Sequence, residues 1–213
     1  GKDQVLLCVA YLVASYDPNT RAELWSQEGT TKSCAGTMAY AGDLVYATGG
    51  YPDASVACYR ADCSGELVWK NNKRLYVPSL LVHNGYVYAS NDKGVAFCWN
   101  ADTGENAWTG RLGGNFSASP VLAGEHIYVP NESGTTFVFI ATPKKLNIVG
   151  RNKLGDETMA SPAICGDRIY LRVDSQKRVC GRRHCTPSAT QSDDDWYPNS
   201  GLSLTDPRLD IER

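Results

Sequence analysis

The stretch Gly85-Tyr86-Val87-Tyr88 is one of four places where a glycine is followed closely by an apolar residue and a tyrosine. The four tyrosines are Tyr46, Tyr88, Tyr128 and Tyr170, so their spacings are 42, 40 and 42 residues. A period of this length is typical of chains that use one supersecondary unit several times. The recurrence therefore predicts a repeat protein.

Two further anchors recur with the same period on either side of these tyrosines. Upstream lie Pro78, Ser119-Pro120 and Ser161-Pro162. Downstream lie two turn-and-tryptophan elements and a looser copy of them, at Asp62–Trp69, Asp102–Trp108 and Asp17–Trp25. Three anchors in the same order at one period indicate a true internal repeat.

Each repeat predicts four short strands. In the unit from Pro78 to Trp108 we expect them at Ser79–Val82, Tyr86–Ser90, Val95–Asn100 and Asn106–Thr109. The connections carry Asn, Asp and Gly, which favour tight turns. Four strands repeated every ~40 residues are typical of a β-propeller blade. The sequence thus predicts an all-β chain of antiparallel four-stranded blades, forming an incomplete ring of about four blades.

The composition and net charge of the chain exclude some classes of function. The chain has 213 residues, of which 42% are hydrophobic and 21% charged, and its formal net charge is −2. A nucleic-acid or membrane-surface protein would need a basic excess to meet phosphates, so we expect neither partner. The longest uncharged apolar stretch, Val5–Ala14, is shorter than the ~20 residues of a membrane-spanning helix. It predicts buried strands rather than a signal peptide or a span.

The repeat resembles that of the PQQ-like, or quinoprotein alcohol dehydrogenase-like, β-propellers. The resemblance covers about residues 20–173 and is carried by the Ser-Pro, Gly-x-x-apolar-Tyr and Asp-x-x-Gly-Glu-x-x-Trp anchors. The stretch Leu112–Pro120 resembles bacterial members, especially those abundant in planctomycete-type genomes. The resemblance implies the propeller fold, also shared with WD40 and YVTN-like proteins, and a periplasmic or secreted location. It implies little about activity, because such propellers host many functions.

Two regions depart from the repeat. In the first unit the expected turn falls at Val9-Ala10-Tyr11, which holds no Gly, Asn or Asp, so we expect the first blade to be only partly formed. After Val173 the repeat stops. We therefore divide the chain into a partial propeller, residues 1–173, and a non-repeat tail, residues 174–213, which we expect to be disordered or non-native. The chain begins with Gly1, and we expect it to be a fragment of a larger protein.

Candidate chemistry is sparse. Cys58 and Cys98 occupy the same position in two repeats, so we expect buried apolar residues rather than metal ligands or a disulfide. Asp102-Thr103-Gly104 matches the aspartic-protease triplet, but it belongs to a repeated turn and no second triplet supplies a partner carboxylate. We expect no catalytic residues, no metal site and no cofactor.

The resemblance leaves one enzymatic alternative, a fragment of a PQQ-dependent dehydrogenase that oxidises alcohols or sugars. The resembled enzymes hold PQQ with calcium beneath an adjacent-cysteine disulfide, and this sequence has no adjacent cysteines. The tryptophans Trp25, Trp69 and Trp108 lie in repeat positions, where we expect them to wedge between blades. No cofactor-binding residue can therefore be carried over from the family.

The favoured hypothesis is a non-catalytic binding or scaffold propeller. Propellers bind at loops, because rigid blades tolerate loop variation. We therefore expect a binding surface on the segments that enter each first strand, at Lys32–Gly36, Asn72–Val77, Gly113–Ala118 and Asp156–Ala160. Its candidate side chains are Arg74, Tyr76, Asn115, Phe116 and Glu157. The partner would be a protein or a small ligand, and the open ends of the ring would favour self-association. A purely structural module inside a larger protein is the third hypothesis.

Overall fold

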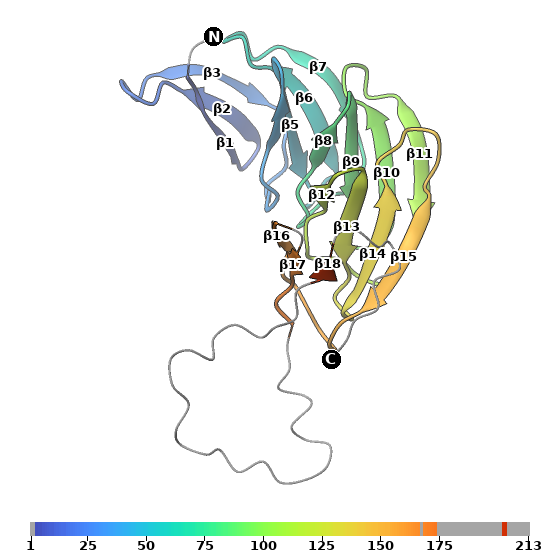
Figure 1. Ribbon diagram of the computed structural model, residues 1–213. Coiled ribbons are helices and arrows are strands. Elements are labelled where there is room, and N and C mark those ends of the chain that lie inside the picture. Colours follow the sequence, from blue (N-terminus) through green and yellow to red (C-terminus); the bar gives the residue numbers. More distant parts are fainter. Residues whose placement is uncertain (1–2, 167, 174–201, 204–213) are drawn as a thin grey trace, which may run out of the picture.

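The computed structural model describes residues 3–166, 168–173 and 202–203. These residues form β-strands joined by turns and loops, and the sheets follow one another around an arc (Figure 1). The three central sheets each contain four antiparallel strands in chain order. Sheet 2 contains β4 (Ala39–Ala41), β5 (Leu44–Gly49), β6 (Ser55–Arg60) and β7 (Leu67–Asn71). Sheet 3 contains β8 (Leu81–His83), β9 (Tyr86–Ser90), β10 (Val95–Asn100) and β11 (Asn106–Arg111). Sheet 4 contains β12 (Val121–Ala123), β13 (His126–Pro130), β14 (Thr135–Ile140) and β15 (Ile148–Lys153).

Among the described residues, the first and last sheets have three strands each. Sheet 1 contains β1 (Val5–Val9), β2 (Leu12–Tyr16) and β3 (Glu23–Glu28). Sheet 5 contains β16 (Ala163–Cys165), β17 (Arg168–Tyr170) and β18 (Leu202–Ser203). The turn at Val9-Ala10-Tyr11, which the sequence left in doubt, does form, and β1 pairs with β2 along its whole length. This hairpin closes without a glycine because Tyr11 takes a φ of 67°, a conformation that disfavours most side chains.

The four strands expected in the third unit are confirmed. β9 and β10 have the predicted bounds, β8 begins two residues later than expected, and β11 ends at Arg111. The pairing of the third and fourth strands also repeats, since the register shifts between Cys58 and Tyr59, between Cys98 and Trp99, and between Val138 and Phe139. The sequence repeat is therefore a structural repeat down to single residues. The tail predicted to be disordered or non-native lies outside the described residues, apart from β18.

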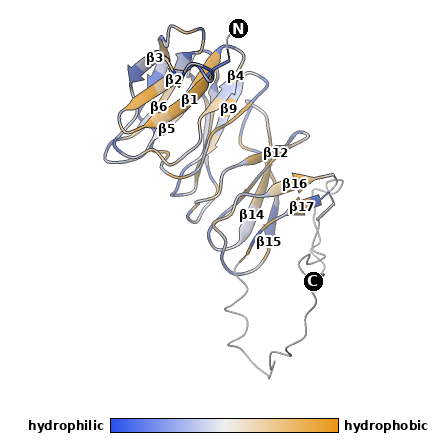
Figure 2. Cartoon of the chain, turned by 90° about the vertical axis from the view of Figure 1, so that its left-hand side faces the viewer, coloured by the Kyte–Doolittle hydropathy of each residue, from blue (hydrophilic) through white to orange (hydrophobic). Residues whose placement is uncertain are grey.

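The core lies between neighbouring sheets. The middle strands β5, β6, β9, β10, β13 and β14 are buried along most of their length, and Figure 2 shows apolar residues along β5 and β6. Strands covered on both faces are expected to be nearly continuous apolar runs. Cys58 and Cys98 are fully buried in these strands, as predicted. Burial raises the pKa of both thiols to about 12.

The tryptophans of the outermost strands tie each sheet to the next. The indole Nε1 of Trp69 donates to the carbonyl of Ala101 at 2.7 Å, and that of Trp108 donates to the carbonyl of Thr142 at 2.7 Å. A Cβ on Gly104, which has a φ of 72°, would lie 2.6 Å from the Trp69 ring. The wedge role predicted for these tryptophans is confirmed, and it explains the glycine of the repeated turn.

A ladder of hydrogen bonds joins the starts of the innermost strands. The backbone N–H of Thr37 donates to Ser79 Oγ, that of Ser79 to Ser119 Oγ, and that of Ser119 to Ser161 Oγ, each at 2.9 Å. The serine at this repeated position therefore satisfies a backbone donor of the segment that leads into the preceding sheet. This ladder fixes the equivalence of loop positions from one sheet to the next, which the site below requires.

Candidate functional site

The loops before β8, β12 and β16 lie beside the hairpins that join the second and third strands of the sheets. The backbone N–H of Phe116 donates to the carbonyl of Asp92 at 3.2 Å, and that of Thr158 donates to the carbonyl of Glu132 at 3.1 Å. The N–H of Glu132 in turn donates to the carbonyl of Asn115 at 2.8 Å. We call this end of the sheets the loop face. Four of the five predicted site residues, all except Phe116, expose their side chains on its loops.

A pocket of about 230 Å³ opens on the loop face between sheets 2 and 3. It is lined by Gly50 and Tyr51 of the β5–β6 hairpin, Arg74 and Tyr76 of the loop before β8, and Asp92 of the β9–β10 hairpin. The side chains of Tyr51 and Tyr76 are 57% and 38% exposed. The pocket thus offers two exposed aromatic rings, a guanidinium and a carboxylate.

Arg74 holds one wall of this pocket in place. Its Nη1 donates to the carbonyl of Gly50 at 2.7 Å, and its Nη2 donates to the carbonyl of Pro52 at 2.9 Å. A guanidinium has five N–H donors, so further donors remain for a ligand. Because its charge is not neutralised by these carbonyls, Arg74 also disfavours a cationic group in the pocket.

Asp92 is the unusual group of the pocket. Its Oδ1 is buried and has no hydrogen-bond partner among the described residues. Glu132 occupies the equivalent position in sheet 4, and its Oε1 accepts a hydrogen bond of 2.6 Å from Ser117 Oγ. Alignment on Ser79 and Ser119 places Val77 where Ser117 stands, so the hydroxyl that would satisfy Asp92 is missing. A buried acceptor without a donor costs free energy that a ligand N–H would recover.

The five predicted residues separate into three groups. Arg74 and Tyr76 line the pocket. Asn115 and Glu157 are exposed on neighbouring loops of the same face and do not line it. Phe116 is fully buried, and its ring lies 5.8 Å from that of Phe137. We therefore assign Phe116 to the core beneath the loop face.

Sequence reasoning missed three residues that line the pocket, namely Gly50, Tyr51 and Asp92. The signal for Asp92 was present, because Asn91-Asp92-Lys93-Gly94 matches Asn131-Glu132-Ser133-Gly134. Only the contacts reveal that one acidic residue has a hydroxyl partner and the other does not. Tyr51 lies in the β5–β6 hairpin, whose turn sequence Gly50–Ala54 does not match the Asn-x-x-Gly turns of the equivalent hairpins.

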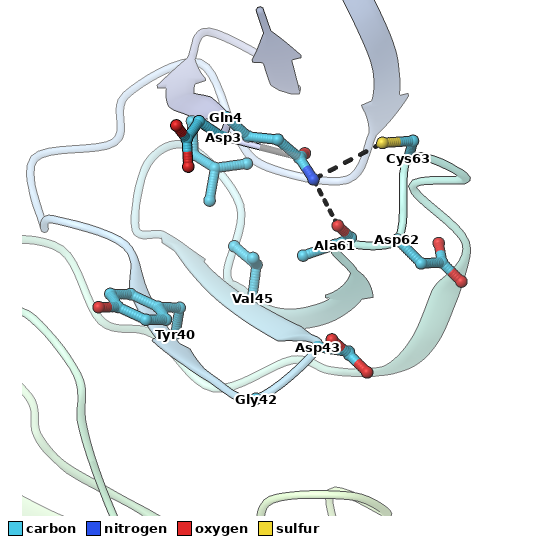
Figure 3. A pocket seen from close by; sticks show the side chains of 10 residues that line it. Asp3, Gln4, Tyr40, Gly42, Asp43, Val45, Ala61, Asp62 and Cys63 are labelled. Carbon is cyan, nitrogen blue, oxygen red and sulfur yellow. Dashed lines mark hydrogen bonds between the residues drawn. The ribbon is translucent and has the colours of Figure 1, made fainter. Parts of the chain in front are cut away.

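A second, wider recess of about 1020 Å³ lies between sheets 1 and 2 (Figure 3). Gln4 crosses it, since its Nε2 donates to the carbonyl of Ala61 at 2.5 Å and its Oε1 accepts from Trp25 Nε1 at 3.1 Å. Its acidic residues include Asp62, whose pKa is lowered because its carboxylate accepts hydrogen bonds from Ser64. Because Gln4, the residue before β1, binds Ala61 and Cys63 after β6 across the recess, we interpret it as a joint between the two sheets.

Known proteins support this architecture. The sequence model of the family described as outer membrane protein assembly factor BamB matches residues 52–183. The chain belongs to this family. The BamB protein of Legionella pneumophila (strain Paris) is 25% identical over 113 residues, which cover 53% of this chain and 29% of that protein.

Two solved structures resemble the BamB-family chain in fold. The crystal structure of BamB from Moraxella catarrhalis matches with a TM-score of 0.63 and 18% identity, over 80% of this chain and 53% of that one. The crystal structure of the computationally designed Ika8 protein matches with a TM-score of 0.62 and 14% identity, over 77% of this chain and 53% of that one. The chain is therefore a partial β-propeller, as predicted. It spans about half the length of these structures. Neither natural relative is from a planctomycete, so the planctomycete-type origin expected from the sequence has no support.

The PQQ alternative can be tested on the residues themselves. Trp25, Trp69 and Trp108 are 6 to 8% exposed, and the indoles of the latter two are bound to the next sheet. They are therefore not available to stack on a cofactor. In the part of the chain that the structure describes, no group of three or more His, Cys, Asp or Glu residues could hold a metal ion. The described residues therefore do not fit PQQ with calcium.

No helix among the described residues is long and apolar enough to cross a membrane.

Proposed function

We propose that this BamB-family chain is a non-catalytic binding or scaffold module whose loop face holds a segment of a partner protein. The observation that carries the proposal is the buried, unpartnered Oδ1 of Asp92, a residue that lines the pocket together with Arg74. A polar pocket with apolar walls and a few directed groups is the usual form of a recognition site.

The chemistry of the pocket favours an amide. Asp92 Oδ1 requires a donor, and the free N–H groups of Arg74 require an acceptor. A peptide group, or the side chain of Asn or Gln, offers both without the positive charge that Arg74 disfavours. Tyr51 and Tyr76 would contact the neighbouring apolar side chain, since tyrosine contributes large contact area at low entropic cost. A protein segment meets these requirements better than an ionic small molecule.

The names of the relatives agree with this proposal. The matching family and the Legionella relative are described as outer membrane protein assembly factors. By analogy we place the chain in the periplasmic or extracellular space, in contact with other proteins. We propose no quinoprotein activity, because Trp25, Trp69 and Trp108 are buried between the sheets and cannot stack on a PQQ ring.

A random dodecapeptide library displayed on phage would test the proposal. We expect selection on the 213-residue chain to enrich peptides that lose at least about tenfold in affinity, or 1.4 kcal/mol, against Tyr76→Ala and Asp92→Ala. Asn115→Ala serves as a matched control on the same face and outside the pocket. Enriched peptides that bind all three variants like the wild type would contradict the proposal.

A further inference from the structure

Cys8 and Cys34 lie together although 26 residues separate them in the chain. Cys8 is in β1, and Cys34 is in the segment between β3 and β4. The two thiols are within hydrogen-bonding contact of one another. The Cys34 thiol also lies 3.8 Å from the carbonyl oxygen of Val9, the residue next to Cys8. Two separate contacts therefore place Cys34 against the end of β1.

The other described cysteines have different surroundings. Cys58 and Cys98 are fully buried, each in the third strand of its own sheet. The Cys63 thiol accepts a hydrogen bond from Gln4 Nε2, and Cys165 is exposed in β16. Among the residues that the structure describes, Cys8 and Cys34 are the pair whose thiols contact each other.

We propose that Cys8 and Cys34 are a disulfide-forming pair that joins sheet 1 to the segment leading into sheet 2. In the reaction each thiol loses its proton, one S–S bond forms, and the two electrons pass to an external disulfide oxidant such as oxidised glutathione, which is reduced to two thiols. The attacking species is a thiolate.

The location gives the bond a structural purpose. In sheets 2 and 3 the tryptophan indole donates a hydrogen bond to the next sheet directly. The ring of Trp25 stacks on Tyr59 of sheet 2, but its Nε1 donates to Gln4, which in turn donates to Ala61. The cluster around Val13 and Trp25 also contains fewer buried residues than the two clusters that follow it along the arc. A covalent bond between β1 and the residues before β4 would stabilise this joint by restricting the unfolded chain.

The thiols also set how fast the bond forms. Burial raises the pKa of the Cys8 thiol to about 12, and the neighbouring Cys34 adds to the shift. Because little Cys8 thiolate exists at neutral pH, we expect oxidation to be slow and to accelerate as the pH rises. This places the bond among structural disulfides rather than reactive catalytic ones.

The experiment uses the full chain, incubated with a mixture of oxidised and reduced glutathione, alkylated, digested with trypsin and analysed by mass spectrometry. We expect residues 3–21 joined to residues 33–60, with fragment spectra that assign the bond to Cys34 rather than Cys58. The melting temperature should rise by about 5 to 10 °C over the reduced protein, and reduction should reverse the rise.

Variants complete the test. Cys8→Ser and Cys34→Ser should each abolish the joined peptide and the rise in melting temperature, whereas Cys165→Ser should retain both. The mapping on the wild-type chain stands even if a variant folds poorly. Recovery of Cys8 and Cys34 as alkylated thiols, or as bonds between two chains, would overturn the proposal.

Discussion

The loops before β8 and before β12 start from the same repeat and end with opposite roles. In the loop before β12, Phe116 is fully buried, and Ser117 satisfies Glu132. In the loop before β8 the fully buried residue is Leu75, one position earlier, and the aromatic Tyr76 is turned outward. A shift of one residue thus converts a closed, internally satisfied loop into a pocket with an aromatic wall.

The comparison shows how a repeat protein acquires a site. Every blade holds its loops on the same backbone structure. A loop whose side chains differ from those of the equivalent loops can therefore be recognised by comparing the blades. Gly50 allows the loop before β8 to pass close to the β5–β6 hairpin, because a Cβ at position 50 would lie 2.4 Å from the Cα of Tyr76. The pocket therefore depends on three local differences, at Gly50, Tyr76 and Val77.

The largest expected effect is a difference in the free energy of unfolding between variants of the two loops. Phe116→Ala should lower the free energy of unfolding by about 3 to 5 kcal/mol, because it opens a cavity against Phe137. Tyr76→Ala should cost less than about 1 kcal/mol, because the ring is partly exposed. Urea unfolding followed by circular dichroism would measure both. Equal losses would show that the two loops do not differ as described.

A smaller effect is expected at the hydroxyl that closes the loop before β12. Ser117→Val should reduce stability by about 1 to 2 kcal/mol, since Glu132 Oε1 loses its donor. Val77→Thr, which adds a hydroxyl in the equivalent position, should change stability by less than about 0.5 kcal/mol or raise it slightly. Thermal unfolding of the two single variants would check the pair. A destabilising Val77→Thr would break the equivalence between the loops.

The smallest effect on stability is expected at Arg74. Arg74→Met keeps the apolar stem and removes the bonds to Gly50 and Pro52, so we expect a loss of about 1 kcal/mol or less for an exposed side chain. Binding of a library-selected peptide should nevertheless weaken at least about tenfold. Titration by calorimetry would measure the affinity. An unchanged affinity would remove Arg74 from the site.

Much of the fold could be predicted from the sequence, because the repeated residues that mark each strand follow turns that are recognisable in the local sequence. Tyr46 and Tyr88 follow turn glycines, and Trp69 and Trp108 follow repeated turns, so the period reports strand order directly. The joint at Gln4 could not be predicted in this way. It depends on a contact with Ala61, 57 residues away and outside the repeat pattern.

The site was predicted only in part. The loops were located correctly because turns between buried strands are visible in the sequence. The inward or outward direction of a loop side chain was not, since Asn115-Phe116-Ser117 and Leu75-Tyr76-Val77 both place an aromatic residue three positions before the ladder serine. Tertiary packing against Phe137 and Gly50 decides which ring is buried.

The affinity of the Val77→Thr variant for a peptide selected on the wild-type chain tests the central claim most directly. The added hydroxyl would donate a hydrogen bond to Asp92 Oδ1. It would not alter the shape of the pocket, because threonine and valine have the same branching. We predict binding at least about tenfold weaker than wild type, with Ser117→Val binding normally. Equal affinities for the wild type and Val77→Thr would contradict recognition through Asp92.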